Sequence, residues 1–255
     1  MCLPGISRMQ MIEVDRIIVN ELKVPIELMM EHAGLSLARL AVALSNRKNP
    51  EFCIIAGSGN NGGGGLAAAW RMANWDYDVT VIIPKGFPSL HEVPMAQLIR
   101  LQSMGIDAED IMPRSFPENV TILDAFIGYG NRKRDDAIAS LVFNSIRSHK
   151  RVISLDAPSG LDVTTGVSYN GIHPIATMTL AFVKIGLLKA SPHEVGELYI
   201  CDIGVPAEIY LNRLGIDWSS PFDATAIDNL SDAFAADPLN KVQLSHSENC
   251  QCWNV

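Results

Sequence analysis

Residues 52–66 read FCIIAGSGNNGGGGL, and this stretch decides the expected fold class. The apolar run at 52–56 stops at the first glycine, which is typical of a buried strand. Apolar residues then recur at helical spacing from Leu66 to Ala73, so a helix is expected after the glycines. Residues 57–62 between the two match the pattern G-x-G-x-x-G. The stretch therefore predicts a strand, a glycine loop and the N-terminus of a helix.

The alternation of strands and helices continues on both sides of this stretch. Short β-branched or apolar runs predict strands, and apolar residues three or four positions apart predict helices. The predicted strands are 52–56, 79–83, 120–123, 152–155, 176–183 and 197–203, and the predicted helices besides the one after the glycines include 9–22, 26–44, 94–104 and 206–213. Apolar strands that alternate with helices favour an α/β fold, in which a mostly parallel sheet lies between two helical layers.

A further helix is predicted after the strand at 120–123. Asp135 is a suitable N-cap residue for it. Ile138, Leu141, Val142 and Ile146 follow at helical spacing, so we expect these four side chains to be buried.

The chain has 255 residues, which corresponds to one large domain or two small ones. The alternation ends near residue 215, so we expect a single three-layer α/β/α domain over residues 1–215. Residues 216–255 have no clear period and end in SHSENCQCWNV. We expect a loosely structured C-terminal tail there.

The composition excludes several classes of protein. Apolar residues make up 48% of the chain and charged residues 19%, which excludes a disordered chain. The net charge of −8 argues against nucleic-acid binding, and five scattered cysteines do not form a disulfide framework. No apolar run is long enough to cross a membrane, and the N-terminus has no apolar signal core. We therefore expect a globular, cytoplasmic protein.

The glycine loop is a candidate phosphate-binding site. A helix N-terminus presents free N–H groups to an anion, and glycine permits close approach and positive φ. A standard NAD dehydrogenase is disfavoured because the second strand ends in Ile83-Pro84-Lys85, without the acidic residue of that fingerprint. No Gly-Lys-Ser/Thr follows to complete a P-loop. A tight turn that binds nothing is the alternative.

Two aspartates follow predicted strands, at the edge of the sheet where parallel α/β proteins bind ligands. Asp124 ends one strand, Asp156 ends the next, and Ser159 lies on a turn just beyond. Together with Asn61 of the glycine loop, Asp124 and Ser159 offer only oxygen ligands, which suits a hard and plausibly monovalent cation. Each aspartate could instead cap a helix or order a loop.

Lys184 ends a predicted strand and has apolar neighbours. It could bind a substrate phosphate or tune a nearby carboxylate, or it could extend from the surface into solvent. The polar run at 131–134, after the predicted strand at 120–123, also allows two interpretations. Asn131, Arg132, Lys133 and Arg134 could contact the phosphates of a dinucleotide or form a solvated loop.

Five motifs, in order along the chain, resemble the YjeF N-terminal domain family. They are GSGNNGGGG (57–65), DAFIGYG (124–130), DAPSGLD (156–162), LAFVKIGLL (180–188) and GELYICDIGVP (196–206), and residues 11–15 and 28–34 also match. The resemblance extends over about residues 9–212, and its most specific parts are the D-x-P-S-G-x-D and N-N-G-G runs. It implies a Rossmann-like fold, often homodimeric, with a bound potassium ion.

The resemblance also implies an activity. Most characterised members of the family are NAD(P)H-hydrate epimerases, which interconvert the R and S epimers of NADHX and NADPHX in nicotinamide nucleotide repair. Asn61, Asp124 and Ser159 match the family's potassium ligands. The positions that match its substrate-binding residues are Asn60, Asn61, Gly62, Gly63, Gly64, Gly128, Tyr129, Gly130, Asn131, Arg132, Lys133, Arg134 and Asp156.

Asp156 is the expected acid–base residue because it ends a central strand, and Lys184 is expected to set its charge. Many bacterial relatives are fused to a dehydratase domain. A chain of 255 residues is too short for both parts, so we expect NAD(P)H-hydrate dehydratase to be a separate protein in the pathway.

Gly64 departs from the family loop, which usually reads N-N-G-G-D-G. The change removes a carboxylate beside the expected substrate. It supports an alternative function, a catalytically inactive scaffold or a nucleotide-binding interaction module. Asp124, Asp156, Ser159 and Lys184 favour the enzyme, because an inactive site has no need of the full polar set.

Overall fold

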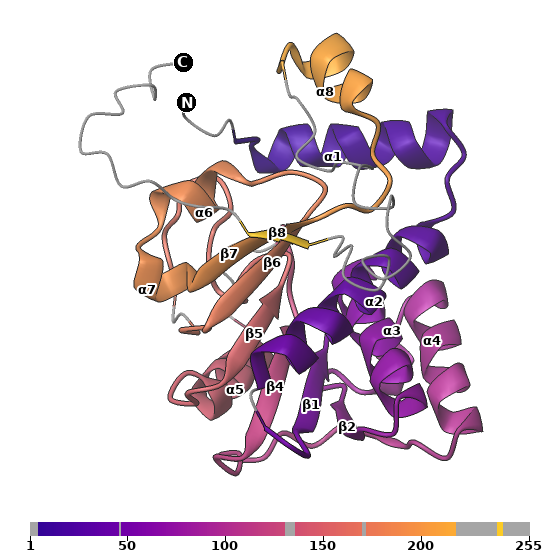
Figure 1. Ribbon diagram of the computed structural model, residues 1–255, viewed down its shortest axis with the longest axis vertical. Helices are drawn as coiled ribbons and strands as arrows, with labels where there is room; N and C mark the ends of the chain where they lie inside the picture. The colour runs from indigo at the N-terminus through magenta and orange to yellow at the C-terminus, as the bar shows by residue number, and fades with distance from the viewer. Residues whose placement is uncertain (1–4, 46, 131–135, 170–171, 218–238, 242–255) are drawn as a thin grey trace.

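The computed structural model describes residues 5–45, 47–130, 136–169, 172–217 and 239–241. Its strands form one eight-stranded sheet in the order β3-β2-β1-β4-β5-β6-β7-β8 (Figure 1). Every neighbouring pair from β3 to β7 is parallel, and β8 pairs antiparallel with β7. The strands are β1 (Glu51–Ala56), β2 (Asp78–Ile82), β3 (Ala108–Glu109), β4 (Val120–Ala125), β5 (Val152–Leu155), β6 (Ala176–Leu180), β7 (Glu197–Cys201) and β8 (Leu239–Lys241).

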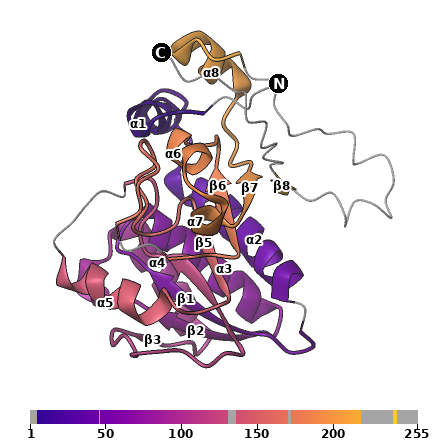
Figure 2. The same ribbon diagram turned by 90° about the vertical axis from the view of Figure 1, so that its left-hand side faces the viewer.

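Helices cover both faces of the sheet. They are α1 (Arg8–Arg16), α2 (Ile26–Ser45), α3 (Asn60–Asn74), α4 (Glu92–Ser103), α5 (Ala137–Ile146), α6 (Ile185–Lys189), α7 (Pro192–Val195) and α8 (Ala207–Leu214), with a π-helix η1 (Ile17–Glu21) and a 3-10 helix η2 (Phe87–Ser89). Figure 2 shows α2 on one side of the sheet and α5 on the other.

Alternate residues of the central strands face opposite helical layers. Ile54 of β1 and Leu123 of β4 pack in the same cluster as the buried residues of α2 and α3. Their neighbours Cys53 and Ile122 pack instead with the buried residues of α5. This period of two confirms the predicted three-layer α/β/α architecture.

Glycines allow the first helical layer to approach closely. A Cβ on Gly34 of α2 would lie 2.5 Å from the Cβ of Ala67 in α3, a distance that real side chains do not reach. A Cβ on Gly65 of α3 would lie 2.5 Å from the Cβ of Ala125, at the end of β4. The sequence of α3 is therefore glycine-rich partly because its first turns are packed between α2 and the sheet.

The predicted strand at 176–183 was too long. The ladder of β6 ends at Leu180, because Ala181 has a φ of 63° and turns the chain. The strand predicted at 197–203 likewise ends at Cys201. The predicted helix at 9–22 consists of α1 followed without a break by the π-helix η1.

The cap predicted for α5 also needs a correction. Asp135 lies outside the described residues, and Asp136 is the N-cap, with its carboxylate accepting hydrogen bonds from two backbone N–H groups of the first turn. Leu141 is exposed, and Phe143 is buried although it was not predicted to be. The buried apolar face consists of Ala139, Val142, Phe143 and Ile146, at the i, i+3, i+4, i+7 spacing of one helix face.

The N-terminal segment pairs with the residues that follow β6, in an isolated parallel bridge between Ile6 and Lys184. Ile6 donates a backbone hydrogen bond to Val183 and accepts one from Ile185, each 2.9 Å long. This pairing leads into α1, which lies across the end of the sheet at which the parallel strands finish (Figure 1).

Two further findings concern the whole chain. Within the region predicted to be a tail, residues 239–241 form β8, while the division into a domain at 1–215 and a tail stays a prediction. Of the helices in the described ranges, none is both long and apolar enough to cross a bilayer.

Candidate functional site

A pocket of about 750 Å³ opens where the parallel strands end, with walls from α1, the start of α3 and the loops after β4, β5 and β6. Of the predicted site residues, it is lined by Asn60, Asn61, Gly64, Gly128, Tyr129, Gly130, Asp156 and Lys184. Four more, Gly62, Gly63, Asp124 and Ser159, are buried around it. Asn131, Arg132, Lys133 and Arg134 lie outside the described residues.

Asp156 is the first residue after β5, and its backbone is in the left-handed region, with a φ of 68°. Such a conformation is uncommon for a residue with a side chain, although aspartate tolerates it better than most. One carboxylate oxygen accepts hydrogen bonds from Lys184 Nζ (2.5 Å) and, weakly, from the Leu180 N–H (3.4 Å). The other accepts from the Tyr129 N–H at 2.6 Å. The turn therefore holds Asp156 among hydrogen-bond donors, in the wall of the pocket.

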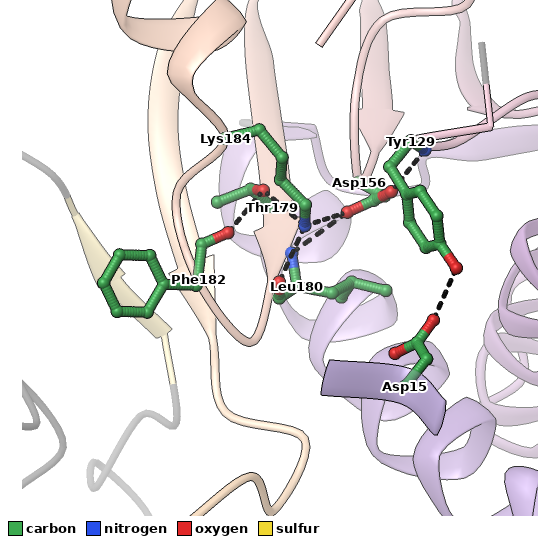
Figure 3. A network of polar contacts seen from close by, with 7 residues as sticks. All are labelled: Asp15, Tyr129, Asp156, Thr179, Leu180, Phe182 and Lys184. Carbon is green, nitrogen blue, oxygen red and sulfur yellow. Dashed lines mark hydrogen bonds and ion pairs between the residues drawn. The ribbon is translucent and has the colours of Figure 1, made fainter. Parts of the chain in front are cut away.

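Lys184 is completely buried, so the surface alternative is wrong. Its ammonium donates to Asp156 Oδ1, to Thr179 Oγ1 at 3.1 Å and to the Leu180 carbonyl at 2.8 Å (Figure 3). All three protons of the ammonium thus have an acceptor. A buried charge is retained at a high desolvation cost, which makes the Asp156–Lys184 pair a strong candidate for function.

Asp124, the fifth residue of β4, lies in a fully buried position beside Ser159. Its carboxylate accepts from the Ser159 hydroxyl (2.6 Å), the Ser159 N–H (2.9 Å) and the Ser154 hydroxyl (2.9 Å). Burial raises the pKa of the Asp124 carboxyl, and these hydrogen bonds only partly oppose the shift. The structure thus brings Asp124 and Ser159 together as predicted.

Asn61 is partly buried, and both polar atoms of its side-chain amide are shielded from solvent. Within the described residues, neither Oδ1 nor Nδ2 of its side chain has a hydrogen-bond partner. A Cβ on Gly128 would lie 2.9 Å from Asn61 Oδ1 and 2.8 Å from Asp156 Oδ2, so both oxygens border the space beside Gly128. An unpartnered buried amide next to oxygen-rich neighbours fits the predicted hard cation.

The positive φ angles expected in the glycine loop are not found, whereas its binding role stays a prediction. Helix α3 begins at Asn60, so residues 62–65 are helical, and no residue from Gly57 to Gly65 has a positive φ. They are glycines because a Cβ would overlap the surroundings: on Gly62 the Gly57 carbonyl, and on Gly63 the Met30 sulfur.

Gly64 is the exception, because its Cβ would meet only the end of the Leu155 side chain, at 3.0 Å. It is also the one among residues 62–65 that lines the pocket. A side chain at position 64 would therefore start from the wall of the pocket.

Sequence reasoning did not assign Asp15 to the site, although it ends the family match at 11–15, and Asp15 lines the pocket from α1. Tyr129 donates its hydroxyl proton to Asp15 Oδ2 at 2.6 Å (Figure 3). Burial raises the pKa of the Asp15 carboxyl, and it also raises that of the Tyr129 phenol. The two residues are 114 positions apart, and no local pattern in the sequence links them. Lys85 also lines the pocket, where it forms an ion pair of 3.2 Å with Asp136.

Comparisons with known proteins agree with the resemblance seen in the motifs. The NAD(P)H-hydrate epimerase of Dehalogenimonas lykanthroporepellens is 35% identical over 217 residues, covering 83% of this chain and 86% of that protein. The NAD(P)H-hydrate epimerase of Lentilactobacillus buchneri is 31% identical over 197 residues, covering 76% and 91%. The bifunctional NAD(P)H-hydrate repair enzyme Nnr of Thermofilum pendens is 30% identical over 220 residues, but the match covers only 42% of its length.

A solved structure has the same fold. The crystal structure of yeast ynu0 superposes with a TM-score of 0.73 at 20% identity, covering 94% of this chain and 100% of that one. The family model described as YjeF-related protein N-terminus matches residues 26–186. With this match over more than half of its length, the chain belongs to the YjeF-related protein N-terminus family.

Proposed function

We propose that this chain is an NAD(P)H-hydrate epimerase, an isomerase that interconverts the R and S epimers of NADHX and NADPHX. The observation that carries the proposal is the buried Asp156–Lys184 pair at the wall of a pocket of dinucleotide size. Relatives at 35% and 31% identity over most of the chain bear this name. The N-terminus of α3, which has no side-chain cap, supplies free N–H groups for a phosphate of the substrate.

The reaction inverts the carbon that bears the hydroxyl of the hydrated nicotinamide ring. The hydroxyl accepts a proton and leaves as water, while the lone pair of the ring nitrogen forms an iminium bond to that carbon. Water then adds from the opposite face and loses a proton to a base, and the electron pair returns to the nitrogen. Asp156 gives the proton to the departing hydroxyl or takes the proton from the added water, and the Lys184 ammonium hydrogen-bonds to its carboxylate.

A potassium ion is proposed as the cofactor. Asn61, Asp124 and Ser159 would hold it, because Asn61 has a buried amide without a partner and the other two supply further oxygens. When bound, the ion supplies positive charge that orders the start of α3 and the loop after β5. Asp124 and Ser159 already order this region by their mutual hydrogen bonds.

The partners are proposed from the chemistry and from the relatives. A bifunctional repair enzyme, in which the match covers 42% of the length, has room for a second activity. We infer that an NAD(P)H-hydrate dehydratase consumes the product of this chain. We also propose a homodimer in the cytoplasm, which sedimentation and cell fractionation would test.

An inactive scaffold or nucleotide-binding module is not favoured. The relatives matched over most of their length are named as enzymes. An inactive domain would also have no reason to keep Lys184 fully buried against Asp156.

The test is to start from one purified epimer of NADHX and to follow its conversion by chromatography, with and without potassium. Catalysis well above the spontaneous rate is expected. Asp156→Asn should lower the rate by about 10²–10⁴-fold, the usual contribution of a general acid or base. Wild-type protein that does not exceed the spontaneous rate would leave the scaffold as the better explanation.

A further inference from the structure

Helix α1 forms a wall of the pocket and carries a second carboxylate into it. Asp15, near the C-terminal end of α1, lines the same pocket as Asp156 and Lys184. The helix is fixed in place by Ile6, whose backbone hydrogen bonds go to the residues on either side of Lys184. The placement of Asp15 opposite the buried pair is therefore built into the fold.

Tyr129 connects the two carboxylates and keeps them apart. Its backbone N–H donates to Asp156 Oδ2, and its hydroxyl donates to Asp15 Oδ2, each at 2.6 Å. Figure 3 shows the tyrosine side chain extending from one carboxylate to the other. The two acids are thus separated by the length of a tyrosine side chain, and they do not share a proton as a close dyad does.

The surroundings of the two carboxylates differ. Asp156 is surrounded by the Lys184 ammonium and by N–H donors, which suit an anion. Asp15 is a half-buried carboxyl whose pKa is raised by burial and by the charge of Asp156, against the hydrogen bond from Tyr129 and the charge of Lys184. Two acids held in different environments on one pocket are suited to act as acid and base in one reaction.

We propose that Asp15 is a second proton-transfer residue of this pocket, acting on the face of the substrate ring opposite to Asp156. The inference rests on the proposed epimerase activity. In one direction, the Asp15 carboxyl gives its proton to the departing hydroxyl, the C–O bond breaks and water leaves. Water adds from the other face, a new C–O bond forms and the Asp156 carboxylate takes the released proton. In the reverse direction the two residues exchange roles, so each turnover moves one proton from one carboxyl to the other.

The experiment compares three variants of the full-length protein in NADHX epimerisation. Asp15→Asn keeps the acceptor oxygen for Tyr129 but cannot transfer a proton, and Asp15→Glu restores a carboxyl. Glu27→Gln removes an exposed carboxylate from the first turn of α2, outside the pocket lining, and is the control. We expect Asp15→Asn to lower kcat by about 100-fold or more with little change in KM, Asp15→Glu to recover part of the lost kcat and Glu27→Gln to change neither.

The pH profile distinguishes proton transfer from a structural role. Activity of the wild type should fall as pH rises and Asp15 loses its proton, and this alkaline limb should be absent in Asp15→Asn. Tyr129→Phe removes a hydrogen bond that lowers the pKa of Asp15, so its limb should move to higher pH with a much smaller loss of kcat.

Three results would overturn the inference. The first is an Asp15→Asn protein with activity within threefold of wild type. The second is an alkaline limb that persists in this variant. The third is a Tyr129→Phe protein as impaired as Asp15→Asn, since Asp15 would then only anchor the tyrosine. A wild-type protein without activity would instead refute the proposed function, on which the inference depends.

Discussion

The residues of the pocket show how one helix serves both packing and ligand access. In the first turns of α3, glycine is required at position 65 by the sheet, whereas position 64 opens on the pocket. The departure from the usual family loop therefore falls at the glycine among residues 62–65 whose Cβ would make the mildest contact, 3.0 Å from the end of Leu155. Gly64 changes the chemistry of the pocket without being needed for packing.

The different packing roles of Gly64 and Gly65 can be measured as the change in the free energy of unfolding on substitution by alanine. Gly64→Ala should change the free energy of unfolding by less than about 1 kcal/mol, because better helix propensity offsets a contact with a flexible leucine. Gly65→Ala should cost about 1–3 kcal/mol, since its methyl group would overlap Ala125 on β4. Equal denaturation midpoints for the two variants would contradict this assignment.

The Asp156–Lys184 pair should dominate the local energetics. Lys184→Met leaves the Asp156 carboxylate buried without its cation, and we expect a loss of about 3–5 kcal/mol in the free energy of unfolding. Adding Asp156→Asn should recover much of this loss, because the unpaired charge is then gone. Urea denaturation of the two single variants and the double variant gives the coupling energy, and additive losses would exclude a buried ion pair.

At the scale of elements, the sequence predicted the order of strands and helices well and their ends less well. The apolar runs of β1, β4 and β5 were recognisable because both faces of these strands are buried. The end of β6 was not, since the apolar run continues to Val183 while Ala181 turns the chain. Asp15 was missed for a related reason: what brings it to Tyr129 is the placement of α1, which depends on pairing between Ile6 and distant residues.

The helical layer on the α2 side is joined by an ion-pair cluster around Glu31 of α2. Glu31 pairs with Arg71 of α3 at 2.7 Å and with Arg100 of α4 at 2.8 Å, and it accepts from Gln97 at 3.1 Å. Burial alone would raise the pKa of Glu31, but these hydrogen bonds and charges outweigh it and hold the pKa below its usual 4.5. The cluster therefore contributes most when Glu31 is ionised.

The stabilisation by the Glu31 cluster depends on pH because the pKa of Glu31 is lowered in the folded protein. Because the pKa of Glu31 is lower in the folded protein, the stabilisation is present above about pH 4.5 and is lost as pH falls through the folded value. Glu31→Gln should cost about 1 kcal/mol at pH 7, as these arginines are partly exposed, and close to nothing at pH 3. The control is Glu118→Gln, an exposed carboxylate in a loop. A loss that does not vary with pH would contradict the ionic origin.

At the scale of the whole molecule, the proposed cation site joins parts of the chain that are far apart in sequence. Asn61 comes from the start of α3, Asp124 from β4 and Ser159 from the loop after β5. Parallel strands bring the ends of these elements to one edge of the sheet, and Asp124 and Ser159 are hydrogen-bonded there. The sequence could predict this meeting, since it follows from topology, but it could not reveal that the Asn61 amide is left without a partner.

Potassium should therefore stabilise the entire fold, and Asn61 gives the sharpest test. A ligand that binds only the folded state adds about 2.7 kcal/mol at one hundred times its Kd, so the unfolding midpoint should rise with KCl and not with equimolar choline chloride. Asn61→Ala should abolish this rise.

Without potassium, the free energy of unfolding of Asn61→Ala should match or exceed that of the wild type, because the variant removes a buried amide that costs about 1–3 kcal/mol when unpaired. Asn74→Ala, at the exposed end of the same helix, should leave the potassium effect intact. If Asn61→Ala responded to potassium as the wild type does, the ion would have to bind elsewhere.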